Sequence, residues 1–240
     1  MNTEGALNSR TVPYGTQPKW QVVQQATSNQ ATSNIVVDFS KRQREVLAAA
    51  LDLMVEAGDA LTMNAVASRA NCSKETLYKW FGDRDGLLTA TVKWQAAKVQ
   101  IELPKSEGLN LERLHGSLKR FAARWLSVLS SDISIALNRT AVSHAVSSKS
   151  DLGIIVLTNG PFAMAHRLKP VLEMGRQAGL LHFDNIDEAF RVFFGLVVRD
   201  MQIRALLGEE VTSLLVDVDH DAERATKQFL ALYSAANNNQ

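Results

Sequence analysis

The stretch "NCSKETLYKWFGDRDGLL", residues 71–88, places three aromatic side chains and several charges in a short segment. Ser73 and Asp83 each precede a run with helical periodicity, which is typical of N-capping residues. Leu77 and Phe81 are four residues apart, so their side chains share one face of a helix. The remaining positions are mostly polar, which indicates a short helix with a narrow apolar seam and a broad polar face directed outward.

Two further helices are predicted in front of this one. Ser40 and Gln43 have the spacing of a capping box before "KRQREVLAAALDLMVEAG", which ends at Gly58. Thr62 is placed to cap "MNAVASRA", and Asn71, which tolerates left-handed backbone, makes the following turn. A helix, a tight turn and a second short helix with a polar face form a helix-turn-helix, whose second helix can enter the major groove of DNA.

The chemistry of the polar face predicts DNA contacts. Lys74 and Lys79 supply cations, and Thr76 offers a hydroxyl and a methyl group. Tyr78 and Trp80 each carry one donor on a stiff ring, which can reach a phosphate oxygen at small entropic cost. The N–H groups at the helix starts also suit phosphate. The candidate DNA-binding residues are Thr62, Ser73, Lys74, Glu75, Thr76, Tyr78, Lys79, Trp80 and Arg84.

Two residues in this segment each have two interpretations. The Glu75 carboxylate either pairs with Lys79 at i,i+4 or accepts a hydrogen bond from a cytosine amine. Cys72 precedes a helix start, where a thiolate is favoured, so it could be a redox sensor. A small core residue is the commoner role for a cysteine in such a place.

The rest of the chain also has helical periodicity. The helix that Asp83 caps is predicted to run to Pro104, and a later helix to start at Pro161, contain Pro170 and stop at Gly179. Another helix is predicted between a cap at Asp184 and a stop at Gly208. No alternating β-branched runs bounded by hairpin turns are present, so no sheet is predicted.

The fold class is therefore predicted to be all-α, with an N-terminal three-helix head that carries the helix-turn-helix on a larger C-terminal helical bundle. The predicted domains are 38–86 for DNA binding and 87–240 for ligand binding and dimerisation. Residues 1–37 are rich in Ser, Thr, Asn and Gln, which predicts a disordered arm. In the alternative interpretation, Arg10, Lys19 and Trp20 of the arm touch DNA or the partner subunit.

Composition narrows the class of protein. The 240 residues carry a net charge of +1, so any charged partner must be met by a local patch. The single cysteine excludes an intrachain disulfide and fits a reducing compartment. Neither a signal peptide nor an apolar run of about 20 residues is present. We expect a cytoplasmic protein that does not enter the membrane.

No catalytic or metal-binding constellation stands out. The five histidines lack metal-ligand spacing, and we find no paired carboxylates, catalytic triad or phosphate-binding loop, so neither an enzyme nor a cofactor is predicted. An α-helical interaction protein without DNA binding remains an alternative. His144 and His166 could line an apolar cavity with Phe121, Trp125 and Met164, or each could be an ordinary core or surface residue.

Residues 44–88, "REVLAAALDLMVEAGDALTMNAVASRANCSKETLYKWFGDRDGLL", resemble the DNA-binding domain of TetR/AcrR-type regulators. That pattern has a first helix ending at Gly, a Thr opening the second, a tight turn, and Thr-Leu-Tyr before an aromatic pair. Here Asn71 replaces the turn glycine, Trp80 replaces Tyr or His, and Arg84-Asp85 replaces Lys-Glu. The resemblance implies base reading from the Lys74–Lys79 face and phosphate contacts from Thr62, Tyr78, Trp80 and Arg84.

The segment from "ALNRTAVSHAV" to "AFRVFFGLVVRDMQIRALLG" is similar to the AefR-like C-terminal domain of some members, although "SSKSDLG" departs from it. Because one short reading head covers only about one half-site, the hypothesis is a homodimeric repressor on a palindromic double-stranded DNA operator, released by an unknown small-molecule effector. The resemblance places a four-helix dimer interface at residues 161–178 and 185–207. The apolar residues expected there are Phe162, Leu168, Leu172, Phe190, Phe194, Val197 and Met201.

Overall fold

The computed structural model describes residues 39–57, 61–104, 107–144, 152–211 and 217–235. Within these ranges the regular elements are helices, and the β pairing is one isolated antiparallel bridge between Leu181 and Ser234. The predicted all-α class is confirmed. The predicted arm, residues 1–37, and the predicted helix end at Gly58 lie outside the described residues.

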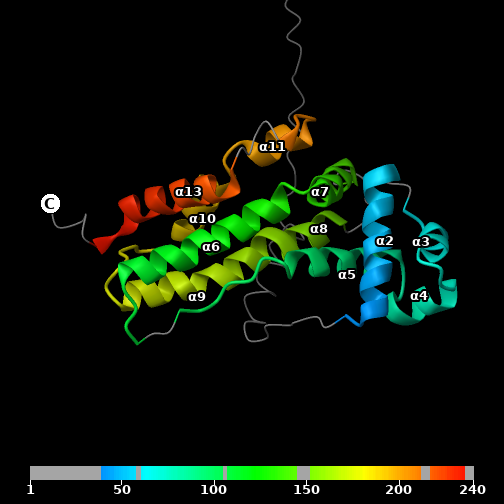
Figure 1. The fold of residues 1–240 in the computed structure, drawn as a ribbon, viewed down its shortest axis with the longest axis horizontal. Coiled ribbons are helices and arrows are strands. Elements are labelled where there is room, and N and C mark those ends of the chain that lie inside the picture. The colour runs from blue at the N-terminus through cyan, green and yellow to red at the C-terminus, as the bar shows by residue number, and fades with distance from the viewer. Residues whose placement is uncertain (1–38, 58–60, 105–106, 145–151, 212–216, 236–240) are drawn as a thin grey trace, which may run out of the picture. The chain divides into compact units, whose positions relative to one another are not determined.

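Three helices form the head, and Figure 1 shows them together: α2 (Lys41–Ala57), α3 (Met63–Arg69) and α4 (Lys74–Phe81). The predicted capping box in front of α2 is confirmed. The Gln43 N–H donates to Ser40 Oγ at 3.2 Å, and the Ser40 N–H donates to Gln43 Oε1 at 2.9 Å. Two otherwise unpaired donors at the helix start are thereby satisfied.

Helix α5 (Arg84–Ala96) begins after the predicted cap Asp83, whose Oδ1 accepts from the Gly86 N–H at 2.7 Å. Its predicted extension to Pro104 is wrong, because the helix ends at Ala96. Arg167, on helix α9 (Ala163–Gln177), donates from Nη1 to the carbonyls of Ala96 at 2.5 Å and Val99 at 2.8 Å. The guanidinium thus satisfies carbonyls that the backbone N–H groups of a longer helix would have bonded.

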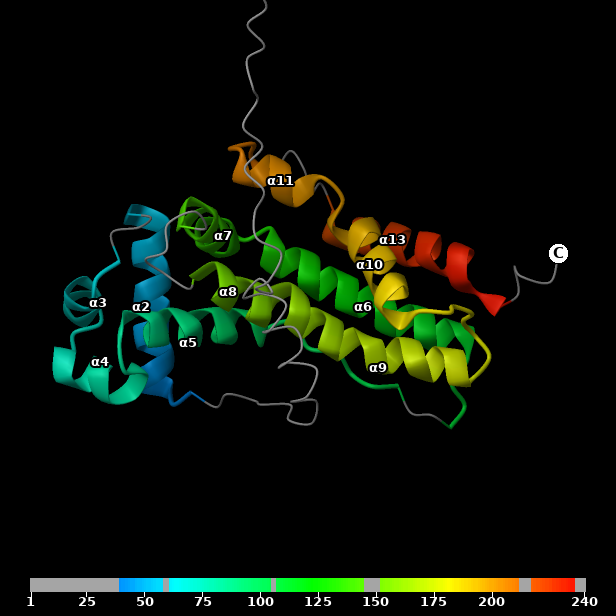
Figure 2. The ribbon, with the colours of Figure 1, turned by 180° about the vertical axis from the view of Figure 1, so that it is seen from behind.

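The other helices form the bundle, in which α6, α9, α10 and α13 pack on one another, as both ribbon views show (Figure 2). No helix in the described ranges is long and apolar enough to span a membrane. The bundle consists of α6 (Leu111–Leu129), α7 (Asp132–His144), α8 (Leu152–Leu157), the π-helical turn η2 (Thr158–Phe162), α9, α10 (Ile186–Val198), α11 (Met201–Leu206) and α13 (Val218–Tyr233).

Pro161 does not start a helix, which corrects the prediction. It lies inside η2, which connects α8 to α9 without a break. Proline has no N–H for the ordinary helical bond, so the local ladder must change. Asn159 contributes to the rearrangement, since its Nδ2 donates to the Ile155 carbonyl at 2.8 Å. Further along, the predicted stop is confirmed: α9 continues through Pro170 and ends before Gly179, which has φ +67°.

The helix predicted from Asp184 to Gly208 is wrong in two respects. Its cap is Asn185, whose Oδ1 accepts from the N–H groups of Asp187 and Glu188 at 2.8 and 3.2 Å. The run is also divided into α10 and α11 at Arg199, which has φ +50°. The Arg199 N–H closes α10 on the Gly195 carbonyl, while its guanidinium lies 3.7 Å from Asp221 of α13.

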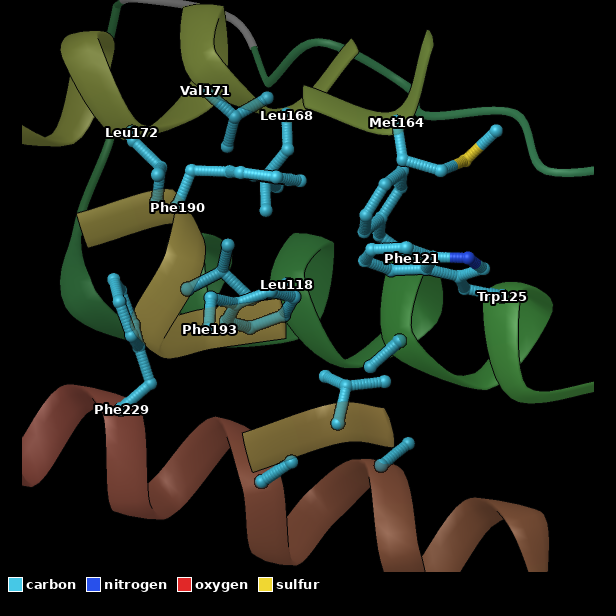
Figure 3. Close-up of a cluster of buried hydrophobic side chains, with 14 of the residues drawn as sticks. Leu118, Phe121, Trp125, Met164, Leu168, Val171, Leu172, Phe190, Phe193 and Phe229 are labelled. Atoms are coloured by element: carbon cyan, nitrogen blue, oxygen red, sulfur yellow. The ribbon is translucent and has the colours of Figure 1, made fainter. Parts of the chain in front are cut away.

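Buried apolar residues form two clusters. The head cluster joins α2, α3, α4 and most of α5 to Leu137 and Ala141 of α7 and to Leu152. The bundle cluster joins α6, α9, α10 and α13, and Figure 3 shows the aromatic rings at its centre. Phe193 of α10 meets Phe229 of α13 edge to face, with ring centroids 5.2 Å apart.

The apolar residues expected at a dimer interface are mostly used by this chain's own core. Five of them are buried in the bundle cluster without any partner subunit, which corrects the prediction for those positions: Leu168, Leu172, Phe190, Val197 and Met201. Phe162 and Phe194 are half-buried.

Substitution of Gly86 tests how closely α4 and α5 pack at their junction. A Cβ at this position would lie 1.8 Å from the Phe81 carbonyl oxygen, so Gly86→Ala must push the two helices apart. We expect it to lower the free energy of unfolding by about 3 kcal/mol or more, measured by urea denaturation. At Gly153 of α8 a Cβ meets nothing within 4 Å, and Gly153→Ala should stay within about 1 kcal/mol of the original chain. Equal stability of the two variants would contradict the tight junction.

Candidate nucleic-acid interface and ligand cavity

Helix α4 presents one polar face outward. Ser73 caps it, accepting from the Thr76 N–H at 3.2 Å, and the seam of Leu77 and Phe81 is buried in the head cluster. The outward positions Lys74, Glu75 and Lys79 are exposed, and Tyr78 retains 52% of its surface. The chain itself therefore leaves this face open to a partner.

The turn before α4 is held by a residue that the sequence analysis missed. Asn71 has φ +49°, as its predicted role in the turn requires. Arg42 of α2 donates from Nη2 to the carbonyls of Ala70 at 2.6 Å and Asn71 at 2.9 Å. This guanidinium ties the helix-turn-helix to α2. An arginine in the first turn of a helix is typical of an exposed position, so the sequence gave no indication that Arg42 contacts this turn.

The N-cap residues of the head form side-chain hydrogen bonds within their own helices. Thr62 Oγ1 accepts from the Ala65 N–H at 3.2 Å, which confirms the predicted cap of α3. The hydroxyls of Ser73 and Thr76 lie 3.0 Å apart and share a hydrogen bond. Thr76 is half-buried, so its outward contribution is smaller than that of its neighbours.

Glu75 is oriented by the start of α4. Hydrogen bonds from its own backbone N–H and then from the Ser73 hydroxyl lower the pKa of this carboxyl, and the charge of Lys74 adds to the effect. Among the described residues it makes no ion pair with Lys79, which was one of the two predicted roles. An ionised carboxylate on the first turn also suits the helix dipole.

The side chains of Trp80 and Arg84, both predicted to contact DNA, make contacts within the head. Trp80 is half-buried, packs against the head cluster and meets Phe81 edge to face at 6.2 Å. Arg84 donates from Nε to the Leu61 carbonyl at 3.0 Å, just before the cap Thr62. That bond joins the start of α5 to the start of α3, so Arg84 positions the head.

Cys72 is a half-buried free thiol packed beside the head cluster. This position matches the small core residue of the two predicted roles.

A cavity is lined by residues of α5 to α8, η2 and α9 to α11. The centre of a water-sized molecule can move over about 70 Å³ of it. The wall contains no charged residue, and its apolar part includes the predicted residues Trp125 and Met164. Its polar part includes Gln95, Ser134, Asn138, Asn159 and Gln202.

The other residues predicted for this cavity lie elsewhere. Phe121 is buried beside Trp125, with ring centroids 5.6 Å apart, and does not reach the wall (Figure 3). His166 is exposed on α9 and is not among the lining residues. His144 is the last residue of α7, and its side chain lies outside the described part of the structure.

Comparison with known proteins gives matches over both parts of the chain. The model of bacterial regulatory proteins of the tetR family matches residues 46–91. The model of the AefR-like transcriptional repressor C-terminal domain matches residues 116–235. No curated protein matches at a significant level.

Solved structures match most of the chain. A TetR transcriptional regulator from Agrobacterium tumefaciens is 43% identical with a TM-score of 0.71, over 83% of this chain and 97% of that chain. The flavonoid-responsive regulator FrrA is 26% identical with a TM-score of 0.60, over 81% of this chain and 97% of its own. The chain therefore belongs to the TetR family of bacterial transcriptional regulators and carries the C-terminal domain of the AefR-like repressors.

Proposed function

We propose that this DNA-binding transcriptional repressor reads a palindromic operator in the bacterial cytoplasm as a homodimer, through the outward face of α4 in each subunit. The observation that carries the proposal is the exposure of Lys74, Glu75, Tyr78 and Lys79 above the buried seam of Leu77 and Phe81. A polar helical face held rigidly outward suits the major groove. A small molecule bound in the cavity would release the DNA.

The homodimer follows from the size of the head. One short helix covers about one half-site, and two heads spaced roughly 34–36 Å apart would read a palindrome. Since most apolar side chains of α9 and α10 are turned inward, the proposed contact uses their outer sides. On α10 these include the exposed Arg191 and Gly195 and the half-buried Val192 and Leu196.

An effector must bind the DNA-free arrangement of the heads better than the DNA-bound one. The cavity supports such a role, because Gln95 in its wall belongs to α5, the helix that follows α4. The similarity to a flavonoid-responsive regulator supports a small organic effector.

A gel shift with the DNA upstream of the chain's own coding sequence tests the function. Binding should be selective for that DNA over an unrelated duplex and should weaken steeply between two salt concentrations. A probe containing one half-site should bind more weakly than the palindrome. A protein that shifts neither duplex would instead be an interaction protein of the same fold.

Tyr78 is proposed to donate to a phosphate oxygen. Tyr78→Phe removes this charge-assisted hydrogen bond and should weaken operator and unrelated DNA alike, by about tenfold. Fluorescence anisotropy titrations at fixed salt would measure both affinities. Tyr233→Phe on α13 is the matched control and should leave both unchanged. A loss confined to the operator would assign Tyr78 to base reading.

Lys79 is proposed to contact both phosphate and a base edge. Lys79→Ala should reduce the slope of log affinity against log salt concentration by about 1 and alter the preferred base at one position. Anisotropy at several salt concentrations and selection from random DNA would measure the two effects. The exposed Lys227 on α13 gives the matched control, Lys227→Ala. An unaltered salt slope would remove Lys79 from the interface.

Glu75, which makes no pair with Lys79, is proposed to accept from a cytosine amine. Glu75→Ala should relax the base preference at one position, a discrimination of about 1–3 kcal/mol, with little change in binding to unrelated DNA. Glu75→Gln preserves the size of the side chain and should relax the same position. The readout is the site preference selected from random DNA. An identical preference in all three proteins would leave Glu75 as a residue that only stabilises the start of α4.

A further inference from the structure

One donor in the cavity wall has no acceptor. Gln95 is 6% exposed, lines the cavity, and its Nε2 makes no hydrogen bond with the described part of the protein. A primary amide nitrogen carries two N–H donors, and buried donors are almost always satisfied. An acceptor supplied from inside the cavity would complete this group.

Each of the other amide nitrogens in the wall makes at least one hydrogen bond. Asn138 Nδ2 donates to the Ser134 carbonyl at 2.7 Å, and Asn159 Nδ2 donates to the Ile155 carbonyl at 2.8 Å. Gln202 Nε2 lies 3.4 Å from Asn138 Oδ1. Of the amide nitrogens that line the cavity, Gln95 Nε2 is thus the one that makes no hydrogen bond within the described residues.

The charge of the wall restricts the ligand further. None of the lining residues is acidic, basic or a histidine. Arg167 lies behind the wall, and its Nη1 donates to the carbonyls of two lining residues, Ala96 and Val99. A charged ligand would lose its hydration without gaining an opposite charge in the wall, which is unfavourable.

The size of the cavity limits the ligand as well. Its 70 Å³ is about half of the roughly 150 Å³ that admits benzene in another protein interior. A single ring would therefore fit only by moving part of the wall. The wall includes η2, and π-helical turns often occur at functional sites.

We propose, resting on the function proposed above, that the effector is an uncharged, mainly apolar molecule of about one ring. It carries an oxygen acceptor that receives a hydrogen bond from Gln95 Nε2. Small aromatic and cyclic ketones, esters and lactones belong to this chemical class.

Three probes of similar shape test the proposal on the full chain: acetophenone, α-methylstyrene, in which a CH₂ group replaces the carbonyl oxygen, and benzoate, which is an anion. Titration calorimetry would give each affinity, and the part of the tryptophan fluorescence quenching that is lost in Trp125→Phe would report entry into the cavity. Acetophenone should bind, and benzoate should bind at least about tenfold more weakly.

The decisive quantity is the ratio of the acetophenone affinity to the α-methylstyrene affinity. Because both probes are compared on both proteins, differences in their intrinsic hydrophobicity cancel. Gln95→Met, which keeps the length of the side chain and removes its donors, should lower this ratio about tenfold. Gln228→Met, at an exposed position on α13, is the matched control and should leave the ratio unchanged.

Three results would overturn the proposal: an unchanged ratio in the Gln95 variant, benzoate as the tightest probe, or no binding of any probe up to its solubility. Gln95→Met should unfold at a temperature no lower than the original chain, since it removes an unsatisfied buried donor. If it does not fold, Gln95→Leu gives the same comparison. DNA binding is measured without any probe, so failure of the proposed function is distinguished from failure of this inference.

Discussion

Helix α5 is packed into both hydrophobic clusters, and this constraint connects the two ends of the protein. Leu87 and Leu88 are fully buried in the head cluster, whereas Ala96 belongs to the bundle cluster. No other helix in the described ranges contributes buried residues to both. The start of α5 follows directly on α4, and its last turns form part of the cavity wall. A movement of the cavity wall at Gln95 would therefore move α5, and α5 leads directly to the DNA-binding face of α4.

Arginine side chains connect α5 and its neighbours through hydrogen bonds to backbone carbonyls. Arg42 holds the turn before α4, Arg84 joins the starts of α5 and α3, and Arg167 closes the end of α5 from α9. Each guanidinium donates to the backbone, and two of them also lie beside a carboxylate: Arg42 is 2.7 Å from Glu45, and Arg84 is 3.9 Å from Asp85. Burial lowers the pKa of Arg167, which reflects the cost of holding its charge away from water. Hydrogen bonds to two carbonyls offset part of that cost.

The head could be predicted in detail because its determinants are local. The caps Ser40, Thr62, Ser73 and Asp83 act on groups within three residues, so a short sequence window contains both partners. The bundle was predicted less well. The periodic pattern continues across both the π-helical turn at Pro161 and the break at Arg199, so it could not predict either change in the helix. The same pattern also could not tell whether Leu168 or Phe190 faces the chain's own core or a second subunit.

The sequence alone determined the all-α class and the outward face of α4. Four-residue spacing fixes which side of a helix Leu77 and Phe81 share, and that leaves the charged positions on the opposite side. Only the tertiary structure decided which hydrogen-bond partners the long polar side chains meet. Arg167 donates to carbonyls about 70 residues earlier in the chain, whereas Gln95 Nε2 makes no hydrogen bond within the described ranges. The reason is physical: whether a buried polar group is satisfied depends on atoms from distant elements, and residue spacing contains no information about them.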